Sequence, residues 1–203
     1  SISGINGTFD TLEGWSQYTR IAGRTYEFGL RSYEGNKAVS WLPNNALNGN
    51  AYQNYGFSGV STTGSVNKPG YYTFNADAWA HGGSALYRGN ESATDFYLIV
   101  NDVVLDKYTP SVGLHEWSAI GQLSGEIYLN EGAVEVRLEM DRHHLNGDYS
   151  GYYASMGYFD NLGWSLDAAT TTSGSNSPEG IENRISTITA TTADLSVKAV
   201  NDA

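Results

Sequence analysis

The sequence predicts an all-β protein, a β-sandwich of the jelly-roll type built from two antiparallel sheets. Its 203 residues include 24 glycines, 15 tyrosines and 5 tryptophans, a composition rich in turn formers and in residues that favour strands. The most regular segments alternate between apolar and polar residues with the period of a strand, and no helical apolar stripe exceeds about two turns. Short strands that follow one another between turns are typical of a sandwich.

The segment 70–81 is the first strand whose two faces can be assigned. Aromatic and small apolar residues alternate in it with residues that are mostly polar. We therefore expect one face of this strand in the core and the other in contact with water. The core face carries Tyr72, Phe74, Ala76 and Ala78, and the water face carries Thr73, Asn75, Asp77, Trp79 and His81.

A second alternating segment, 95–101, ends at a turn signal. Asn101 and Asp102 follow a run of alternating apolar residues, and another short apolar run comes directly after them. An Asn-Asp pair in that position predicts a hairpin into 103–108. The residues expected to face the core are Phe96, Leu98 and Val100.

The segment 132–142 has the cleanest alternation in the chain. We expect Val134, Val136, Leu138 and Met140 to point inward, and Glu135, Arg137, Glu139 and Asp141 to point outward. Counting the weaker segments, we expect about nine or ten strands in all. These further strands are predicted at 18–21, 26–33, 37–42, 116–123, 125–129 and 157–166, with long polar loops near 43–58, 82–94 and 142–153.

Charge and residue types restrict the partners of the chain. The formal net charge is −11, so the clusters of Lys and Arg that bind phosphate are missing. We therefore expect neither a nucleic acid nor an anionic polysaccharide as partner. With no cysteine there is no disulfide framework and no zinc-thiolate site, which leaves packing and an oxygen-ligated ion to stabilise the fold.

The order of segments predicts one domain followed by a tail. Residues 1–167 are expected to form the sandwich, and 168–179 is a Ser/Thr/Gly-rich linker with too little apolar matter to pack. Residues 180–203 are expected to be the truncated start of a following segment. No stretch approaches the roughly 18 to 20 apolar residues of a membrane helix, and we expect a secreted or cell-surface protein whose signal peptide has been removed.

Three motifs, in order along the chain, resemble a known family. NGTFDTLEGWS at 6–16, SYEGNKAVSW at 32–41 and GYFDNLGWSL at 157–166 are similar to segments of carbohydrate-binding modules of the galactose-binding-like jelly-roll type, in families four, nine and twenty-two. The resemblance implies a monomeric, non-catalytic module that binds a polysaccharide or oligosaccharide and is attached to a glycoside hydrolase in its parent chain. SPEGIEN at 177–183 is similar to the start of the C-terminal sorting domains of Bacteroidetes.

The resemblance also implies a structural calcium ion. Ca²⁺ binds six to eight hard oxygens and mixes carboxylates with backbone carbonyls from distant segments. The first-strand acid is Asp here where Glu is common in the family, so its shorter side chain would reach less far. The alternative is that the acids are ordinary turn residues of an acidic protein. The matching positions are the carbonyls of Thr8 and Lys37 and the carboxylates of Asp10, Glu34 and Asp160.

Sugar binding requires an exposed aromatic ring beside hydrogen-bonding groups, because sugars present both C–H faces and hydroxyls. Trp79 is the first candidate, since Asn75 and Asp77 share its face of the strand. We expect the outward residues Arg137 and Glu139 to lie on the same concave sheet and to supply hydrogen bonds. The alternative for that outward row is a solvated face with cross-strand ion pairs.

A second arrangement would place the sugar at the tips of the loops. Trp41 and Tyr52 lie near the loop 43–58, and Tyr149, Tyr152 and Tyr153 lie in the loop 142–153. The remaining tryptophans stand in segments that resemble core or edge structure. We expect Trp15, Trp117 and Trp164 to serve packing.

Catalysis is not expected. The run 139–144 is similar to the Glu-x-Asp-x-x-Glu motif of family-sixteen glycoside hydrolases, but His144 replaces the second acid that such hydrolysis needs. His143 and His144 would point to opposite faces of a strand, and neither a nucleophile elbow nor a phosphate-binding loop occurs. Two hypotheses remain: a carbohydrate-binding module, and a structural or adhesive jelly-roll domain without a glycan site.

Overall fold

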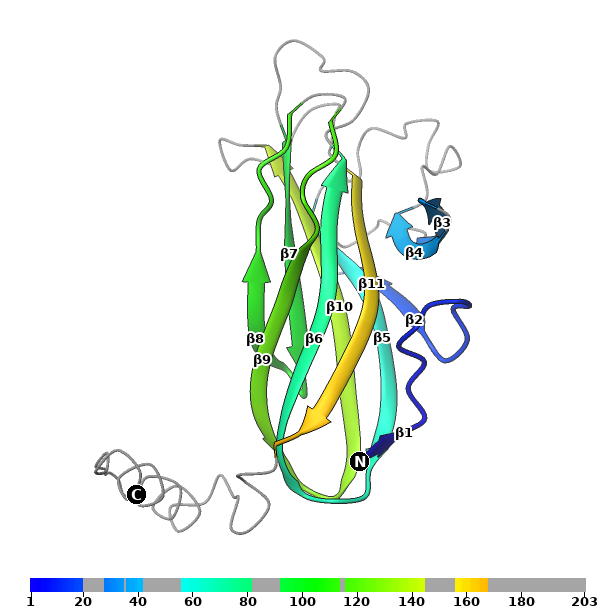
Figure 1. Ribbon diagram of the computed structural model, residues 1–203, viewed down its shortest axis with the longest axis vertical. Coiled ribbons are helices and arrows are strands. Elements are labelled where there is room, and N and C mark those ends of the chain that lie inside the picture. Colours follow the sequence, from blue (N-terminus) through cyan, green and yellow to red (C-terminus); the bar gives the residue numbers. More distant parts are fainter. Residues whose placement is uncertain are drawn as a thin grey trace, which may run out of the picture.

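The computed structural model confirms the predicted fold class (Figure 1). Every element of the described residues is a strand, and every pairing between strands is antiparallel. The strands form two sheets whose inner faces share one core, which is a β-sandwich. The residues that the structure describes are 1–19, 28–34, 36–41, 56–81, 92–113, 116–144 and 156–167.

The first sheet has the strand order β1-β5-β10-β7-β8, and β2 also pairs with β5. Its centre is the long antiparallel pair of β5 and β10, which is in register over eleven residue pairs from Gly132 with Val66 to Arg142 with Gly56. The strands of this sheet are β1 (Ile2–Ser3), β2 (Ser16–Thr19), β5 (Gly56–Val66), β7 (Ser92–Val100), β8 (Val103–Tyr108) and β10 (Gly132–His144).

The second sheet has the strand order β3-β4-β11-β6-β9. In Figure 1 its strands β6, β9 and β11 lie over β5, β7 and β10 of the first sheet. A bulge shifts the register of β11 against β6 between Asp160 and Gly163, and Asn161 within it has a positive φ of 52°. The strands are β3 (Phe28–Tyr33), β4 (Asn36–Trp41), β6 (Gly70–His81), β9 (Gly121–Leu129) and β11 (Met156–Leu166).

The core between the sheets consists of the apolar halves of the alternating strands, as predicted. The rings of Phe96 on β7 and Phe159 on β11 meet edge to face across the sandwich, with centroids 5.2 Å apart. All the residues predicted to face inward on β6, β7 and β10 are buried to 1% exposure or less. They are Tyr72, Phe74, Ala76, Ala78, Phe96, Leu98, Val100, Val134, Val136, Leu138 and Met140.

The hairpin predicted at Asn101 and Asp102 is also confirmed. It joins β7 to β8, and both turn residues have positive φ, 48° and 65°. A two-residue loop with two positive φ angles has the twist that neighbouring antiparallel strands require. Asn and Asp adopt this conformation more readily than other non-glycine residues, which explains their presence here.

Other predictions about the elements were incomplete or wrong. β5 was not predicted as a strand, and the two strands expected at 116–123 and 125–129 are one strand, β9. The ends of the predicted loops at 56–58, 92–94 and 142–144 belong to β5, β7 and β10. The rest of those loops, the linker 168–179 and the segment 180–203 lie outside the described residues. None of the described segments forms a helix long and apolar enough to cross a membrane.

Candidate functional site

The residues predicted to bind sugar lie on two sheets instead of one. Asn75, Asp77 and Trp79 are on β6 in the second sheet, whereas Arg137 and Glu139 are on β10 in the first. All five point away from the core, but the outer faces of the two sheets look in opposite directions. The prediction of a single concave sheet is therefore wrong, because β10 pairs with β5 and β7 and not with β6.

Trp79 is not the exposed ring that the sequence predicted. Its exposed fraction is 3%, and it lies in a small cluster with Ala38 and Tyr158 on the outer side of the second sheet. Tyr158 is its cross-strand neighbour on β11, and the two rings stack with centroids 5.6 Å apart and an angle of 7°. A ring covered in this way cannot stack on a sugar.

Among the described side chains of this face, the exposed indole belongs to Trp117, which was predicted to serve packing. Trp117 is 46% exposed, and its ring lies 5.2 Å from Tyr158 and 4.7 Å from His81. The prediction that a tryptophan serves packing is confirmed for the other two, Trp15 and Trp164. Trp15 packs 4.8 Å from Phe9, and Trp164 packs on the core beside Phe74.

On the first sheet, one line of residues crosses five strands at right angles to them, and we call it the tyrosine row. Because strands are about 4.8 Å apart, its two tyrosines, separated by three such steps, stand roughly 14 Å from each other. The register places every member on the outer face of the sheet. In order, the tyrosine row is Tyr18 on β2, Gly59 on β5, Glu139 on β10, Tyr97 on β7 and Lys107 on β8.

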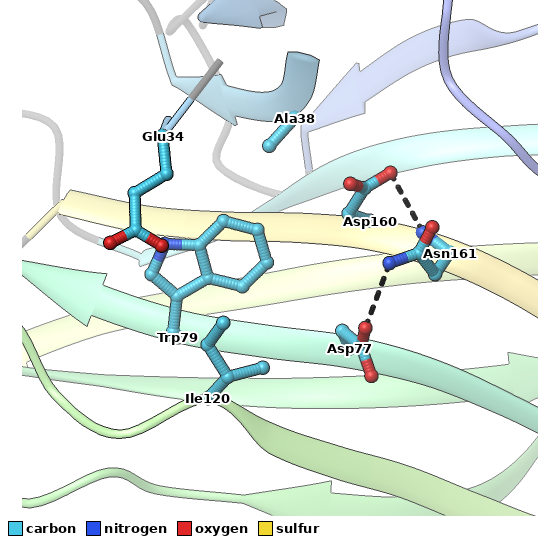
Figure 2. A pocket seen from close by; sticks show the side chains of 7 residues that line it. All are labelled: Glu34, Ala38, Asp77, Trp79, Ile120, Asp160 and Asn161. Atoms are coloured by element: carbon cyan, nitrogen blue, oxygen red, sulfur yellow. Dashed lines mark hydrogen bonds between the residues drawn. The ribbon is translucent and has the colours of Figure 1, made fainter. Parts of the chain in front are cut away.

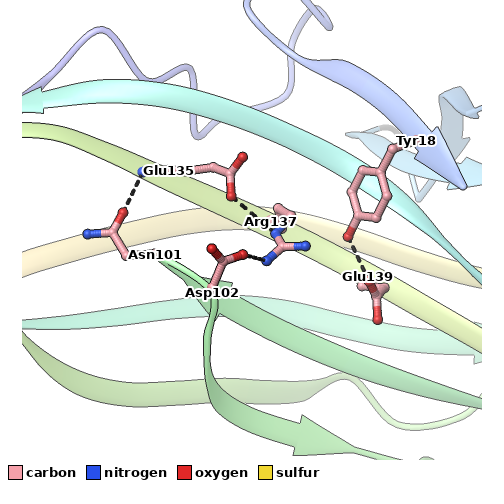
Figure 3. A network of polar contacts seen from close by, with 6 residues as sticks. All are labelled: Tyr18, Asn101, Asp102, Glu135, Arg137 and Glu139. Atoms are coloured by element: carbon pink, nitrogen blue, oxygen red, sulfur yellow. Dashed lines mark hydrogen bonds and ion pairs between the residues drawn. The ribbon is translucent and has the colours of Figure 1, made fainter. Parts of the chain in front are cut away.

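Gly59 leaves room for the Tyr18 side chain. A Cβ atom at Gly59 would lie 2.8 Å from the Tyr18 hydroxyl oxygen and closer still to the carbonyl of Leu138. With that space open, the Tyr18 hydroxyl donates a hydrogen bond of 2.9 Å to Oε1 of Glu139 (Figure 3). A side chain on a short edge strand is thereby fixed over the middle of the sheet.

Arg137 stands beside the row and is held by the β7–β8 turn. Its guanidinium pairs with Asp102 of the turn, and its Nε lies 3.2 Å from Glu135 (Figure 3). Asn101 anchors the turn to β10, since it exchanges two hydrogen bonds of 2.9 Å with the backbone of Glu135. The guanidinium also lies 5.9 Å from the centre of the Tyr18 ring, within cation–π range. The turn thus fixes both the arginine and the ring.

Carboxylates line the outer face of β10 and β7. The exposed fractions of Glu139 and Asp141 are 1% and 4%, so these outward residues are more buried than the sequence predicted. Asp95 lies directly opposite Asp141 and accepts a hydrogen bond of 2.6 Å from Thr109. Burial, and then Asp95, raise the pKa of Tyr97, so its hydroxyl remains a hydrogen-bond donor at neutral pH.

The segments predicted to hold calcium do lie next to one another. The Lys37 ammonium donates a hydrogen bond of 3.5 Å to the carbonyl of Asp10, and the amide of Leu162 on β11 donates one of 2.9 Å to the carbonyl of Gly7. Thr8 donates to the carboxylate of Asp10 at 3.3 Å. The N-terminal turn, the turn around Glu34 and the bulge of β11 therefore meet on one side of the second sheet.

These residues do not form a finished ion site. Within the described parts of the chain, no three acidic or histidine side chains are close enough to share a metal ion. Burial raises the pKa of Asp160, and the nearby carboxylates of Asp77 and Asp10 raise it further. The ionised form of Asp160 thus destabilises the fold at neutral pH, and a bound cation would offset that effect. Calcium binding, which would draw Asp10 and Glu34 toward Asp160, stays a prediction.

Calcium at ten times its dissociation constant is expected to stabilise the wild-type chain by about 1.4 kcal/mol. For a domain of this size the melting temperature should rise by roughly 3–6 °C relative to chelator. The Asp160→Asn variant should show no calcium-dependent rise, because it loses the central carboxylate ligand. The matched control is Asp106→Asn on β8. The melting temperatures are measured by differential scanning fluorimetry. If calcium raised the melting temperature of wild type and Asp160→Asn equally, Asp160 would be excluded as a ligand.

The bulge of β11 also borders a small hollow in the second sheet (Figure 2). Its volume is about 100 Å³, enough for a few water molecules or one small group. Asn161 closes one side, because its side-chain amide donates to Asp77 at 2.9 Å and its backbone amide donates to Asp160 at 2.8 Å. The hollow is lined by Glu34, Ala38, Asp77, Trp79, Ile120, Asp160 and Asn161.

The loop-tip alternative falls largely outside the described residues. Tyr52, Tyr149, Tyr152 and Tyr153 are not among them. Trp41 is the last residue of β4, where its backbone pairs with Phe28. His143 and His144 are the last two residues of β10. The loop-tip site therefore stays a prediction.

No protein-family model matches the chain, and no curated protein matches its sequence. Its structure is similar to a family 61 carbohydrate-binding module in complex with β-1,4-galactotriose, with a TM-score of 0.41 and 13% identity over 79% of this chain and 92% of the other. A xylan-binding domain of family 22 matches at a TM-score of 0.43 and 14% identity, over 79% of this chain and 92% of the other. A structure of the family 22 and catalytic modules of Clostridium thermocellum xylanase 10B, in complex with xylohexaose, matches with a TM-score of 0.48 and 14% identity. The match covers 81% of this chain and 28% of that one. Identities this low describe a likeness of fold and assign no ligand to this chain.

Proposed function

We propose that the chain is a non-catalytic carbohydrate-binding module that holds a neutral polysaccharide across the outer face of the first sheet. The observation that carries this proposal is the tyrosine row, in which two fixed tyrosines flank a buried glutamate and stand beside a held arginine. Sugars need such a combination, because their C–H faces pack on aromatic rings while their hydroxyls require donors and acceptors.

The two tyrosines are fixed before any ligand arrives. The Tyr18 ring is held by its hydrogen bond to Glu139 and by Arg137, and the Tyr97 ring has the Lys107 ammonium 5.7 Å from its centre. Both tyrosines are half-buried, so part of each ring remains accessible. Binding to side chains that are already ordered costs less conformational entropy, which favours affinity.

The charge of this face selects the kind of polysaccharide. Glu139, Asp141 and Asp95 are buried to 8% exposure or less, so they act on a ligand through their negative charge, which repels carboxylates and sulfates. Arg137 does not offset this charge, since it is already paired with Asp102 and Glu135. A neutral glycan of plant type, with many hydroxyl donors, is therefore the ligand class that fits best.

Replacing Tyr97 with alanine is expected to weaken binding of a neutral polysaccharide at least tenfold, or about 1.4 kcal/mol. The measurement is affinity electrophoresis of the purified chain in gels that contain xylan, galactan or mixed-linkage glucan. The matched control is Tyr128→Ala, because Tyr128 is a half-buried tyrosine on β9 of the opposite sheet. Unchanged retention of the Tyr97 variant would contradict the proposed face. If no polysaccharide retards the wild type, the structural or adhesive alternative is favoured.

The proposal includes a role in a longer protein. The three motifs at 6–16, 32–41 and 157–166 resemble modules that accompany glycoside hydrolases, and this supports a monomeric, secreted or surface-exposed module that targets such an enzyme to its substrate. A fusion of residues 1–167 to a hydrolase that lacks its own module should increase activity on insoluble glycan but not on short soluble oligosaccharides. An equal effect on both substrates would speak against targeting.

A further inference from the structure

We propose that the second sheet carries another saccharide site on its outer face, built around Trp117 and the hollow beside Trp79. This site is separate from the tyrosine row, because the two lie on opposite outer sides of the sandwich. Its ligand is one unit of a neutral sugar, bound by one face of the ring. The inference goes beyond the proposed function, which needs the first sheet alone.

The exposed indole of Trp117 is held by a stack of rings. Trp79 and Tyr158, 3% and 5% exposed, lie nearly parallel with centroids 5.6 Å apart. Trp117 packs on Tyr158 at 5.2 Å and on His81 at 4.7 Å, and 46% of its surface remains exposed. The buried rings therefore act as a base that fixes the orientation of an exposed one. An indole that is already oriented can stack on a sugar at low entropic cost.

The backbone around Trp117 is also tied to β6. Trp117 forms an isolated bridge with His81, and the amide of Ser118 donates to the carbonyl of Ala80 at 2.8 Å. The hydroxyl of Ser118, itself only 8% exposed, accepts a bond of 2.9 Å from the amide of Ala80. The segment thus extends the edge of the second sheet. Trp117 is fixed by regular hydrogen bonding in addition to side-chain packing.

The hollow supplies the hydrogen-bond acceptors that a single indole lacks. Its wall combines apolar surface from Trp79 and Ile120 with oxygen acceptors from Asp77 and Asn161, neither of which is a predicted calcium ligand (Figure 2). Trp79 and His81 point to the same side of β6 two residues apart, so the hollow and the Trp117 ring are neighbours at roughly 7 Å along the strand. A sugar that stacks on Trp117 can therefore direct hydroxyl groups toward the Asp77 carboxylate and the Asn161 side-chain oxygen.

The size and charge of this surface indicate the occupant. A hollow of about 100 Å³ is well below the roughly 300 Å³ or more of pockets that enclose a small molecule, so it receives a group and not a whole ligand. Among the described residues, the exposed apolar side chains here are Trp117 and Ile120, and two side chains offer far less area than the roughly 800 Å² per partner of a protein interface. The part of its lining that the structure describes includes Glu34, Asp77 and Asp160 and no basic residue. Hydroxyl donors fit this lining, whereas sugar carboxylates and sulfates do not.

Two saccharide sites on opposite faces would make the module bivalent toward a polysaccharide surface. Once one site is occupied, the second meets neighbouring chains at a raised effective concentration, so retention exceeds the affinity of either site. Short oligosaccharides, which cannot reach both sites at once, should show two independent binding events.

The test is isothermal titration of the whole chain with xylohexaose, β-1,4-galactotriose and cellohexaose, in wild type, Trp117→Ala and Tyr97→Ala. For at least one sugar, we expect two sites in wild type and a loss of about tenfold or more in one of them in Trp117→Ala. Tyr97→Ala should weaken only the other site. Ile120→Ser provides a second variant in the same surface, and Val104→Ser, on an exposed residue of β8, is the matched control.

Three results would overturn the inference. The first is binding of every sugar by Trp117→Ala with the stoichiometry and affinity of the wild type. The second is a concentration-dependent dimer in size-exclusion chromatography that Trp117→Ala abolishes, because the surface would then be a contact between copies of the chain. The third is stronger binding of glucuronic-acid-substituted oligosaccharides than of neutral ones at this site. If Tyr97→Ala left every binding event unchanged, that result would instead count against the proposed function.

Discussion

Replacing Phe159 with alanine is expected to lower the free energy of unfolding by about 3–5 kcal/mol, the cost of removing a large buried aromatic side chain. Phe159 is fully buried and joins the two sheets through its edge-to-face contact with Phe96. Its backbone pairs on one side with Val39 on β4 and on the other with Ala78 on β6, so neighbouring strands limit how far the cavity can collapse.

Urea denaturation followed by tryptophan fluorescence measures this loss. The matched control is Val104→Ala, which also shortens an apolar residue but at a position that is 54% exposed. Its free energy of unfolding should change by less than about 0.5 kcal/mol. A loss below about 1 kcal/mol for Phe159→Ala would mean that the two sheets do not depend on this contact.

Replacing Gly59 with alanine is expected to destabilise the first sheet by about 1–3 kcal/mol and to weaken glycan binding at the same time. The added Cβ would meet the Tyr18 hydroxyl and the Leu138 carbonyl at distances that real Cβ atoms do not tolerate. One of these groups has to move. Displacement of the Tyr18 hydroxyl breaks its hydrogen bond to Glu139 and releases the ring from the tyrosine row.

Thermal unfolding and affinity electrophoresis together test this prediction. Ser61→Ala is the control, because Ser61 is the next outward residue on β5, and its replacement adds no atom. The double variant Gly59→Ala with Tyr18→Phe removes the hydroxyl and should recover part of the lost stability, but not the binding. Full stability and full binding in Gly59→Ala would contradict the close approach of Tyr18.

Alternation along single strands predicted much of the fold. The inward residues of β6, β7 and β10 were assigned correctly because consecutive strand residues point to opposite faces, whatever their partners are. The β7–β8 hairpin was predicted for a similar reason, since an Asn-Asp turn is a local signal. These features depend only on residues that are neighbours in the sequence.

β5 was missed because its signal comes from its partners. Among its inward residues are Val60, Thr62, Gly64 and Val66, and the residues between them are mostly serine, threonine and glycine. In the sequence, a segment with so few apolar side chains resembles a loop. The strand forms because it is paired along its length with β10 and, on its other side, with β1 and β2. Pairing with neighbouring strands commonly overrides the intrinsic strand preference of a segment.

The candidate site failed in prediction for the same reason. Alternation assigns a residue to a face but not to a sheet, so Trp79 and Arg137 were placed together although β6 and β10 belong to different sheets. The burial of Trp79 depends on Tyr158, which is distant in sequence. The tyrosine row is likewise invisible in the sequence, because only the register of three strand pairs brings Tyr18 and Tyr97 into one line.

An NMR titration of the ¹⁵N-labelled chain with xylohexaose and with β-1,4-galactotriose tests most directly whether the first sheet binds glycan. Binding along the tyrosine row should shift, for at least one sugar, the amides of Tyr18, Gly59, Glu139 and Tyr97, four residues from four strands that only the register brings into line. Shifts that spare all four of these amides, while the sugar binds elsewhere on the chain, would contradict it.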